Sequence, residues 1–105
     1  MKRCDTMTDV RAAIDAVDRD IVPLLLERLR YIERAGVIKQ NRDTVHDDAR
    51  IEDVVSKVRA CAREHGGSAD YVEDIYRYLI GWSIDHEFTV WDRVHDRDEQ
   101  PDGQS

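Results

Sequence analysis

The sequence predicts an all-α protein that has three helices in each chain, one long and two shorter, and that forms a homodimer. Apolar residues recur at intervals of three and four along three segments, which is the period of amphipathic helices. Charged residues make up 37% of the chain, which holds only two prolines and five glycines, as is typical of long helices with a solvated face. The first apolar stripe is also longer than a domain of 105 residues can cover.

The longest helix is expected from about Thr8 to Gln40, with Thr8 or Asp9 as its N-cap. Pro23 lies inside this range, where a proline removes a backbone donor and crowds the preceding turn at a cost of roughly 3 kcal/mol. Because the apolar stripe keeps its phase on both sides of Pro23, the sequence predicts a kink and not a break. The stripe consists of Val10, Ile14, Val17, Ile21, Leu24, Leu25, Ile32 and Ala35.

A polar connection over residues 41–45 leads to two further helices. Asp47 and Asp48 can cap the second helix, and Gly66 with Gly67 would end it. The third helix can begin at a Ser68 cap. The positions in phase are Ile51, Val54, Val55, Val58 and Cys61 on the second helix, and Val72, Ile75, Tyr76, Leu79, Ser83, Val90 and Val94 on the third.

The composition indicates where the protein is located and which classes of function are excluded. No apolar run approaches the roughly 18 residues of a membrane span, and the first residues lack the apolar core of a signal peptide, so we expect a soluble cytoplasmic protein. Cys4 and Cys61 match no metal or redox spacing and are expected to be reduced thiols. A net charge of −7 argues against nucleic-acid binding. We expect residues 1–95 to form one helical domain and the polar residues 96–105 to form a disordered tail.

The length of the first helix calls for a partner. A helix of about 33 residues is roughly 50 Å long, whereas a compact domain of this size has a radius of gyration near 13 Å. The apolar stripe runs along nearly the whole helix, so the part beyond the domain needs cover, and a second copy in a twofold dimer is the commonest source. A free-standing coiled coil is the alternative, but it leaves the apolar faces of the other two helices without a role.

Two cations lie in the centre of this stripe. At 100° per residue, Arg28 and Lys39 fall within about 20° of the middle of the apolar face. A buried, unpaired cation is costly, so the two either pair with carboxylates or line a site for an anion. Arg11 is about 25 Å from Arg28 along the helix axis. One small molecule can therefore contact both arginines only if they belong to different copies of a twofold dimer.

Further polar residues can complete an anion site. Arg50, at the start of the second helix, adds a cation beside a helix N-terminus, which itself favours anions. On the third helix Ser83 falls inside the stripe and Glu87 lies at its edge, one turn later. A non-catalytic helical dimer that binds a partner would explain the long stripe, but it would not explain the cations within it.

Five segments carry a family resemblance: DVRAAIDAVDRDIV at residues 9–22, ER at 27–28, Lys39, DDAR at 47–50 and GWSIDHE at 81–87. Together they resemble the AroQ-class chorismate mutases and their relatives, the isochorismate-pyruvate lyases, over roughly residues 9–92. The resemblance implies an intertwined homodimer with shared active sites that acts on a dicarboxylate, either chorismate or isochorismate, without metal or cofactor. The rearrangement of chorismate to prephenate needs no nucleophile, so catalysis would come from confining the reactive conformer and stabilising charge on the breaking C–O bond.

The resemblance also implies a role for each residue of the site. Arg11 of one protomer and Arg28 of the other would bind the two substrate carboxylates. Lys39 would bind a carboxylate and the ether oxygen that gains negative charge. Glu87 stands where many members carry a glutamine that donates a hydrogen bond to the same oxygen. The other matched positions are Arg50 and Ser83, which would contact the substrate, and Asp47, an acidic position in the site loop.

Departures from the family pattern leave two reactions open. Ile51 stands where mutases commonly place a glutamate that holds the substrate hydroxyl, and there the chain is similar to the lyases. The short loop before Arg50 and the tryptophans Trp82 and Trp91 are also similar to the lyases. Ser83 is similar to the mutases. We favour the chorismate mutase and keep the isochorismate-pyruvate lyase as the alternative.

Glu87 is a second departure, because a carboxylate cannot donate a hydrogen bond to the ether oxygen. We expect burial either to keep Glu87 protonated near neutral pH or to make the enzyme prefer acid. An ion pair with Lys39 is the alternative.

Overall fold

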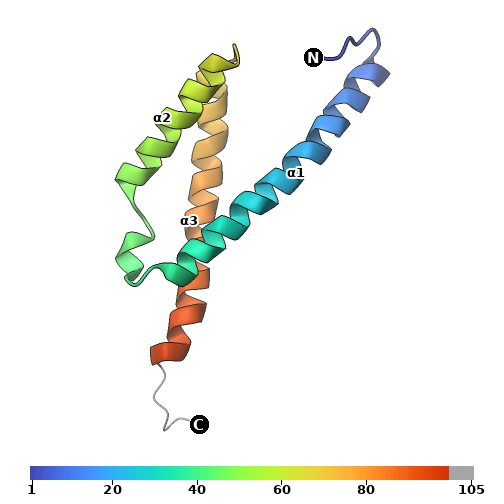
Figure 1. Cartoon of the computed structure of the whole chain (residues 1–105). Helices are drawn as coiled ribbons and strands as arrows, with labels where there is room; N and C mark the ends of the chain where they lie inside the picture. Colours follow the sequence, from blue (N-terminus) through green and yellow to red (C-terminus); the bar gives the residue numbers. More distant parts are fainter. Residues whose placement is uncertain (100–105) are drawn as a thin grey trace. The chain divides into compact units, whose positions relative to one another are not determined.

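The structure is a computed structural model that describes the backbone of residues 1–99 and the side chains of residues 1–96. Within this range it contains three α-helices and no strand: α1 (Met7–Ile38), α2 (Asp48–Glu64) and α3 (Ala69–Glu99), with a short 3₁₀ turn, η1 (Arg42–Thr44), before α2 (Figure 1). The all-α prediction is confirmed. Of the two helices predicted to be shorter, α2 has 17 residues, whereas α3 has 31 and is nearly as long as α1 with 32.

Helix α1 begins and ends slightly earlier than predicted. Thr8 and Asp9 already lie inside the helix, and the cap is Thr6, whose Oγ1 accepts a hydrogen bond of 3.1 Å from the backbone N–H of Asp9. The sequence reasoning placed the cap too close to the first stripe residue. The helix continues through Pro23, as predicted, and the kink stays a prediction.

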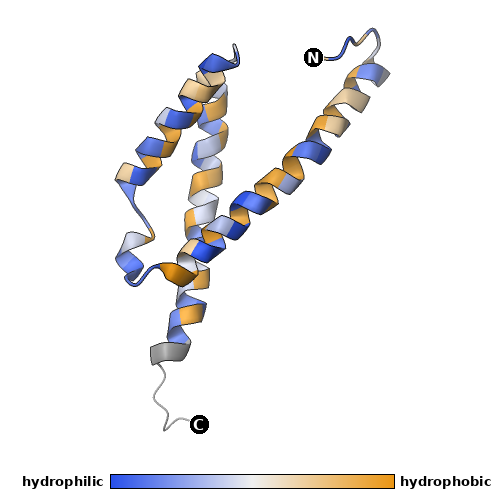
Figure 2. Cartoon of the chain, viewed as in Figure 1, coloured by the Kyte–Doolittle hydropathy of each residue, from blue (hydrophilic) through white to orange (hydrophobic). Residues whose placement is uncertain are grey.

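The chain divides into two units, Met1–Tyr31 and a second that begins at Ile32. In the first unit no residue is buried. Its apolar and polar residues alternate along the helix (Figure 2), and the stripe residues from Ile14 to Leu25 are 42–64% exposed. A single helix cannot bury its own stripe, so this unit needs cover from another surface.

The second unit is built around α2 and α3, which lie side by side (Figure 1). Asp47 caps α2 as predicted, since its carboxylate accepts from the backbone N–H of Arg50 at 3.1 Å. Gly66 ends α2 with a φ of +73°, a conformation that glycine adopts without strain, and Gly67 donates to the Ala62 carbonyl at 2.9 Å. Each of these bonds is local, which is why the sequence predicts the turn correctly.

A small core holds the second unit together. Its buried apolar side chains, among the described residues, are Val45, Val55, Ala62, Ile80 and Val90. Ser83 and Glu87 are also buried. A polar group in so small a core is costly unless a partner satisfies it, and these two residues therefore mark the place in the fold where function is expected.

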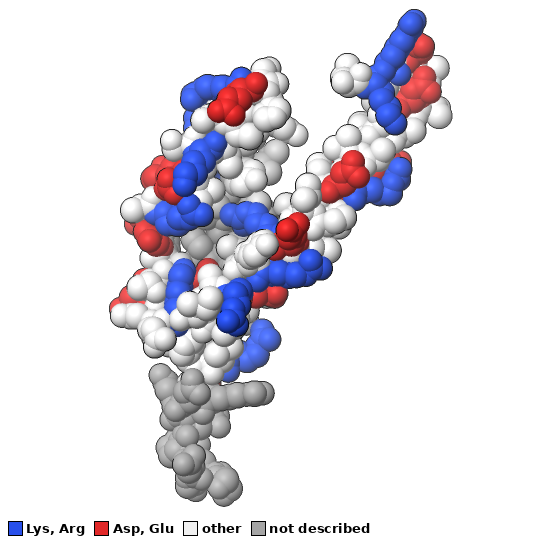
Figure 3. Space-filling model, in the orientation of Figure 1, with Lys and Arg blue, Asp and Glu red and all other residues white. Residues whose placement is uncertain are grey.

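Ion pairs tie α2 to α3 along their exposed sides. Arg77 of α3 contacts Glu52 of α2 at 3.0 Å and Glu73 at 2.6 Å, and its hydrogen bonds hold the pKa of both carboxyls below the ordinary range. Arg59 of α2 reaches Asp70 and Glu73 at 2.9 and 2.6 Å. Figure 3 shows positive and negative side chains intermixed over α2. Arg59 and Arg77 therefore form ion pairs that stabilise the packing of α2 on α3.

The C-terminal end of α3 extends past the predicted domain boundary. The helix is described to Glu99, four residues beyond residue 95, because polar residues without an apolar stripe can still continue an established helix. The rest of the predicted tail, residues 100–105, lies outside the described residues. Within the described part, no helix is both long and apolar enough to cross a membrane.

Candidate functional site

Lys39 and Glu87 form an ion pair in the second unit. The Lys39 Nζ lies 2.7 Å from Oε2 of Glu87, whose side chain is only 5% exposed, while that of Lys39 is 30% exposed. Among the described residues, no group donates a well-aligned hydrogen bond to this oxygen. The sequence leaves two possibilities for Glu87: a side chain that burial keeps protonated or that makes the enzyme prefer acid, or an ion pair with Lys39. The structure has the ion pair. Lys39 balances the charge of Glu87, but Oε2 of Glu87 can still accept a hydrogen bond.

Ser83 lies one turn before Glu87 on α3. Its side chain is buried, and its hydroxyl donates to the Leu79 carbonyl at 2.7 Å. This bond to the preceding turn of the helix satisfies the hydroxyl hydrogen. Ser83, Glu87 and Lys39 are thus the predicted site residues that the structure brings together.

A glycine allows the end of α1 to approach α3 at this point. A Cβ atom on Gly36 would lie 3.1 Å from Cγ1 of Val90 and 3.2 Å from the carbonyl oxygen of Glu87. Both distances are shorter than ordinary contacts, so only glycine fits without a shift. The sequence reasoning missed Gly36, although a single glycine inside a helical stripe is a signal of close packing.

The segment after Lys39 is fastened to α3. The indole N–H of Trp91 donates to the Lys39 carbonyl at 3.0 Å. Arg42 pairs with Asp92 through two contacts of 2.8 and 3.2 Å and holds the pKa of that carboxyl below its ordinary range. The guanidinium of Arg42 also lies 4.5 Å from the centroid of the Phe88 ring. None of these contacts between the segment and α3 was predicted, because residues about fifty positions apart share no local pattern.

Arg50 and Asp47 lie at the start of α2, as predicted. Asp47 acts there as the cap. The Arg50 guanidinium is exposed and contacts Asp53 at 2.6 Å. The pKa of Asp53 is lowered first by Lys57 and then by Arg50. An anion at this helix N-terminus would therefore compete with Asp53 for Arg50.

Arg11 and Arg28 belong to the first unit. Arg11 is exposed, whereas Arg28 is half-buried. They lie on the same helix, about 25 Å apart along its axis. This spacing agrees with the expectation that one small ligand cannot contact both arginines of a single chain.

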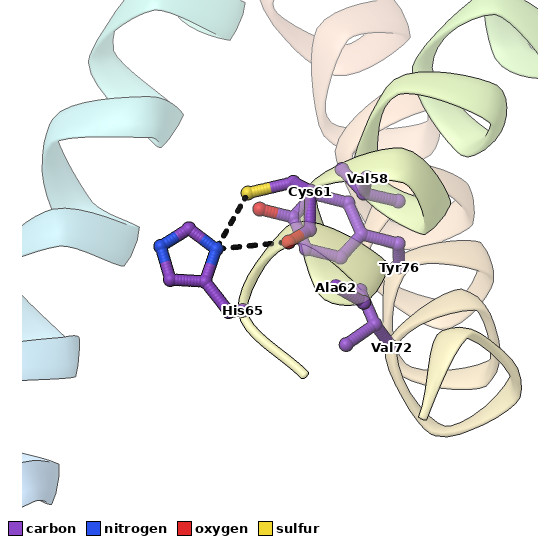
Figure 4. Close-up of a pocket in the computed structure, with 6 residues that line it drawn as sticks. All are labelled: Val58, Cys61, Ala62, His65, Val72 and Tyr76. Carbon is purple, nitrogen blue, oxygen red and sulfur yellow. Dashed lines mark hydrogen bonds between the residues drawn. The ribbon is translucent and has the colours of Figure 1, made fainter. Parts of the chain in front are cut away.

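A separate pocket of about 260 Å³ lies between the end of α2 and the start of α3 (Figure 4). Its lining is mostly apolar and has no lysine or arginine: Val58, Cys61, Ala62, His65, Val72 and Tyr76. Nδ1 of His65 donates to the Cys61 carbonyl at 2.8 Å, so it cannot also accept a proton from the thiol 3.8 Å away. The pocket therefore offers neither an anion site nor a cysteine activated by histidine. Elsewhere in the described part, no metal-binding cluster of His, Cys, Asp and Glu is found.

Comparison with known protein families identifies the family of this chain. The family described as chorismate mutase type II matches residues 10–88. The protein belongs to the chorismate mutase type II family. The match contains every predicted site residue from Arg11 to Glu87, and it confirms the resemblance found in the sequence.

Two curated relatives align with most of this chain. The isochorismate pyruvate lyase of Pseudomonas aeruginosa is 30% identical over 88 residues, which cover 84% of this chain and 87% of the relative. The T-protein of Haemophilus influenzae is 28% identical over 88 residues, which cover 83% of this chain but 23% of that protein. Relatives with different names therefore align with most of this chain.

The contact at Gly36 generates a stability prediction. Gly36→Ala should destabilise the protein by up to about 2 kcal/mol, because overpacking against Glu87 and Val90 costs about 1–3 kcal/mol and better helix propensity returns about 1 kcal/mol. Gly81→Ala is the matched control on α3, where an added Cβ meets no atom within 4 Å, and it should stabilise by up to about 1 kcal/mol. Urea unfolding followed by circular dichroism, at one protein concentration, measures both. Equal stability of the two variants would contradict the close approach.

Proposed function

We propose that the protein is a chorismate mutase, which rearranges chorismate to prephenate, and that it works as a homodimer with active sites shared between the chains. The observation that carries the proposal is the Lys39 ammonium beside the buried Glu87, in a chain of the chorismate mutase family. A cation and a carboxyl at the edge of a small core suit a reaction that needs charge stabilisation and no nucleophile.

Lys39 is suited to stabilise the developing charge. As the C–O bond of chorismate breaks, its ether oxygen gains negative charge. The Lys39 ammonium carries three protons, and one directed at Glu87 leaves two for the substrate. Its side chain is largely shielded from water, where a charge acts more strongly than in bulk solvent. Because Lys39 is already held in place, little reorganisation is needed during the reaction.

Glu87 changes its role when the substrate arrives. In the ligand-free chain its carboxylate is balanced by Lys39. A dianionic substrate brings like charge to the same place, which favours the neutral form of the carboxyl group. The neutral form can donate a hydrogen bond to the ether oxygen, as the glutamine of other family members does. This role predicts an enzyme that works better in acid.

The arginines supply the substrate carboxylate contacts. Arg11 of one chain and Arg28 of the other would each form a charge-assisted pair with a carboxylate. The exposed stripe of the first unit supports the dimer, because a second copy would cover it and bring the two arginines to one site. Arg50 would join the site by exchanging Asp53 for the substrate.

A second candidate is the isochorismate-pyruvate lyase. It is supported by the relative of that name, which aligns over 84% of this chain, and by Ile51 in place of the glutamate of many mutases. Both reactions have cyclic transition states and use the same cationic site. We favour the mutase because Ser83 follows the mutase pattern and lies, buried, one turn from Glu87.

The function is tested by a paired assay on the purified protein. One arm follows chorismate loss and prephenate formation, and the other follows pyruvate release from isochorismate. We expect prephenate formation, and we expect Arg28→Ala to lower kcat/KM by about 100-fold or more, since one lost charge donor commonly costs this much.

The other outcomes are distinct. Pyruvate and salicylate from isochorismate, without prephenate, would replace the mutase by the lyase. No turnover in either arm would leave a helical dimer that binds a partner or a different anion.

The shared site is tested by mixing two inactive variants. If Arg11 and Arg28 act from different chains, a heterodimer of Arg11→Ala and Arg28→Ala has one intact site and one site that lacks both arginines. Random reassociation of equal amounts should then restore about a quarter of the wild-type activity. Each variant refolded alone is the control. Sites formed within one chain would give no recovery on mixing.

The role of Glu87 is tested by the pH dependence of the rate. Glu87→Gln keeps a hydrogen-bond donor at every pH, whereas the wild-type side chain donates only when protonated. The wild-type kcat should fall as the pH rises, and the Glu87→Gln rate should change much less over the same pH range. Parallel profiles would remove Glu87 from the mechanism.

A further inference from the structure

We propose that Trp91 is a positioning residue for the reaction: its indole N–H holds the backbone of Lys39 and thereby fixes the place of the Lys39 ammonium. Nε1 of Trp91 lies 3.0 Å from the Lys39 carbonyl oxygen, and the contact is partly buried. Trp91 is one turn beyond Glu87, so both residues lie on the same face of α3. The inference rests on the proposed function, because it concerns the same lysine.

The backbone of Lys39 would be loose without this bond. Lys39 follows the last residue of α1, where carbonyl groups have no partner within the helix. Its N–H donates to the Ala35 carbonyl at 3.0 Å, and its own carbonyl accepts from Trp91. The two backbone groups are thus anchored to different helices, which fixes the point from which the side chain extends.

Lys39 is consequently tied to α3 through its backbone and through the tip of its side chain. Glu87 holds the ammonium at 2.7 Å, and Trp91 holds the carbonyl. A free lysine side chain has several rotatable bonds and loses up to about 2 kcal/mol of entropy when it is fixed. The ion pair with Glu87 meets part of that cost before the substrate binds. Misplacement of a reacting group by about 1 Å can cost up to 100-fold in rate.

The indole ring of Trp91 is itself held in place. It stacks on the His95 ring with centroids 4.0 Å apart and planes 12° apart, and Nδ1 of His95 donates to the Trp91 carbonyl at 2.9 Å. Trp82 offers a comparison on the same helix, since it stacks on His86 at 5.2 Å and is half exposed. Trp91 therefore combines a fixed ring with a directed donor.

The kinetic test removes the donor and keeps an aromatic ring. Trp91→Phe should lower kcat by roughly 3- to 30-fold and change KM by less than about threefold, since the bound substrate still meets the same charges. Trp82→Phe is the matched control and should keep kcat within about twofold of the wild type. An equal loss in both variants would overturn the proposal, because the effect would then follow from any lost indole on α3.

A double-mutant cycle separates positioning from a general structural effect. If Trp91 acts through Lys39, adding Trp91→Phe to Lys39→Ala should change the residual rate by less than about twofold. The same 3- to 30-fold loss in the Lys39→Ala background would overturn the proposal.

A measurement independent of activity keeps the proposal testable if the proposed function fails. The chain has two tryptophans, so each indole N–H signal in an ¹⁵N NMR spectrum can be assigned with the two phenylalanine variants. The Trp91 indole proton should exchange with solvent at least about tenfold more slowly than that of Trp82, because it is hydrogen-bonded and shielded. Equal exchange would show that the hold on Lys39 is absent, even if the wild type is an active mutase. If the exchange is slow but the protein has neither mutase nor lyase activity, the hydrogen bond between Trp91 and Lys39 is confirmed and only the proposed function is refuted.

Discussion

The buried carboxylate of Glu87 is the constraint from which the arrangement of the second unit follows. A charged group inside so small a core must be balanced, and the partner is Lys39, 48 positions earlier in the sequence. For Lys39 to reach Glu87, the end of α1 must press against the backbone of α3, and Gly36 makes that approach possible. Trp91 and Arg42 then fasten the chain that follows. The close packing at Gly36, the hydrogen bond from Trp91 and the charge of Glu87 thus all act on the position of Lys39.

The helices themselves follow largely from local signals. Asp47, Ser68 and Gly66 occupy the cap and turn positions that the sequence predicts, because each makes its decisive hydrogen bond within a few residues. The first cap is missed for a local reason as well, since Thr6 and Thr8 are chemically alike and only the observed bond to Asp9 distinguishes them. The length of α3 is missed because its last polar turn carries no apolar period.

The contacts within the site lie beyond such reasoning. Periodicity places Lys39 and Glu87 on apolar faces and so marks each as unusual, but it cannot pair two helices or set their separation. That separation depends on Gly36, a residue that no charge argument would select. The ring of Trp91 stacks on His95, and its donor function depends on where the Lys39 carbonyl lies. The candidate site residues stand out by their charge, their polarity and the family resemblance, whereas the contacts that support them require the fold.

The distribution of ion pairs shows why this point of the molecule is suited to a ligand. In ten further ion-pair contacts among the described residues, the carboxylate is at least 23% exposed, so water shares in its solvation. Glu87 is 5% exposed and lacks a well-aligned donor at Oε2. Such a pair gains little from its own attraction, because the carboxylate has lost its water. A ligand that brings hydrogen-bond acceptors to Lys39 would take up the remaining donors of its ammonium group. The ether oxygen and the carboxylates of the proposed substrate are acceptors of this kind.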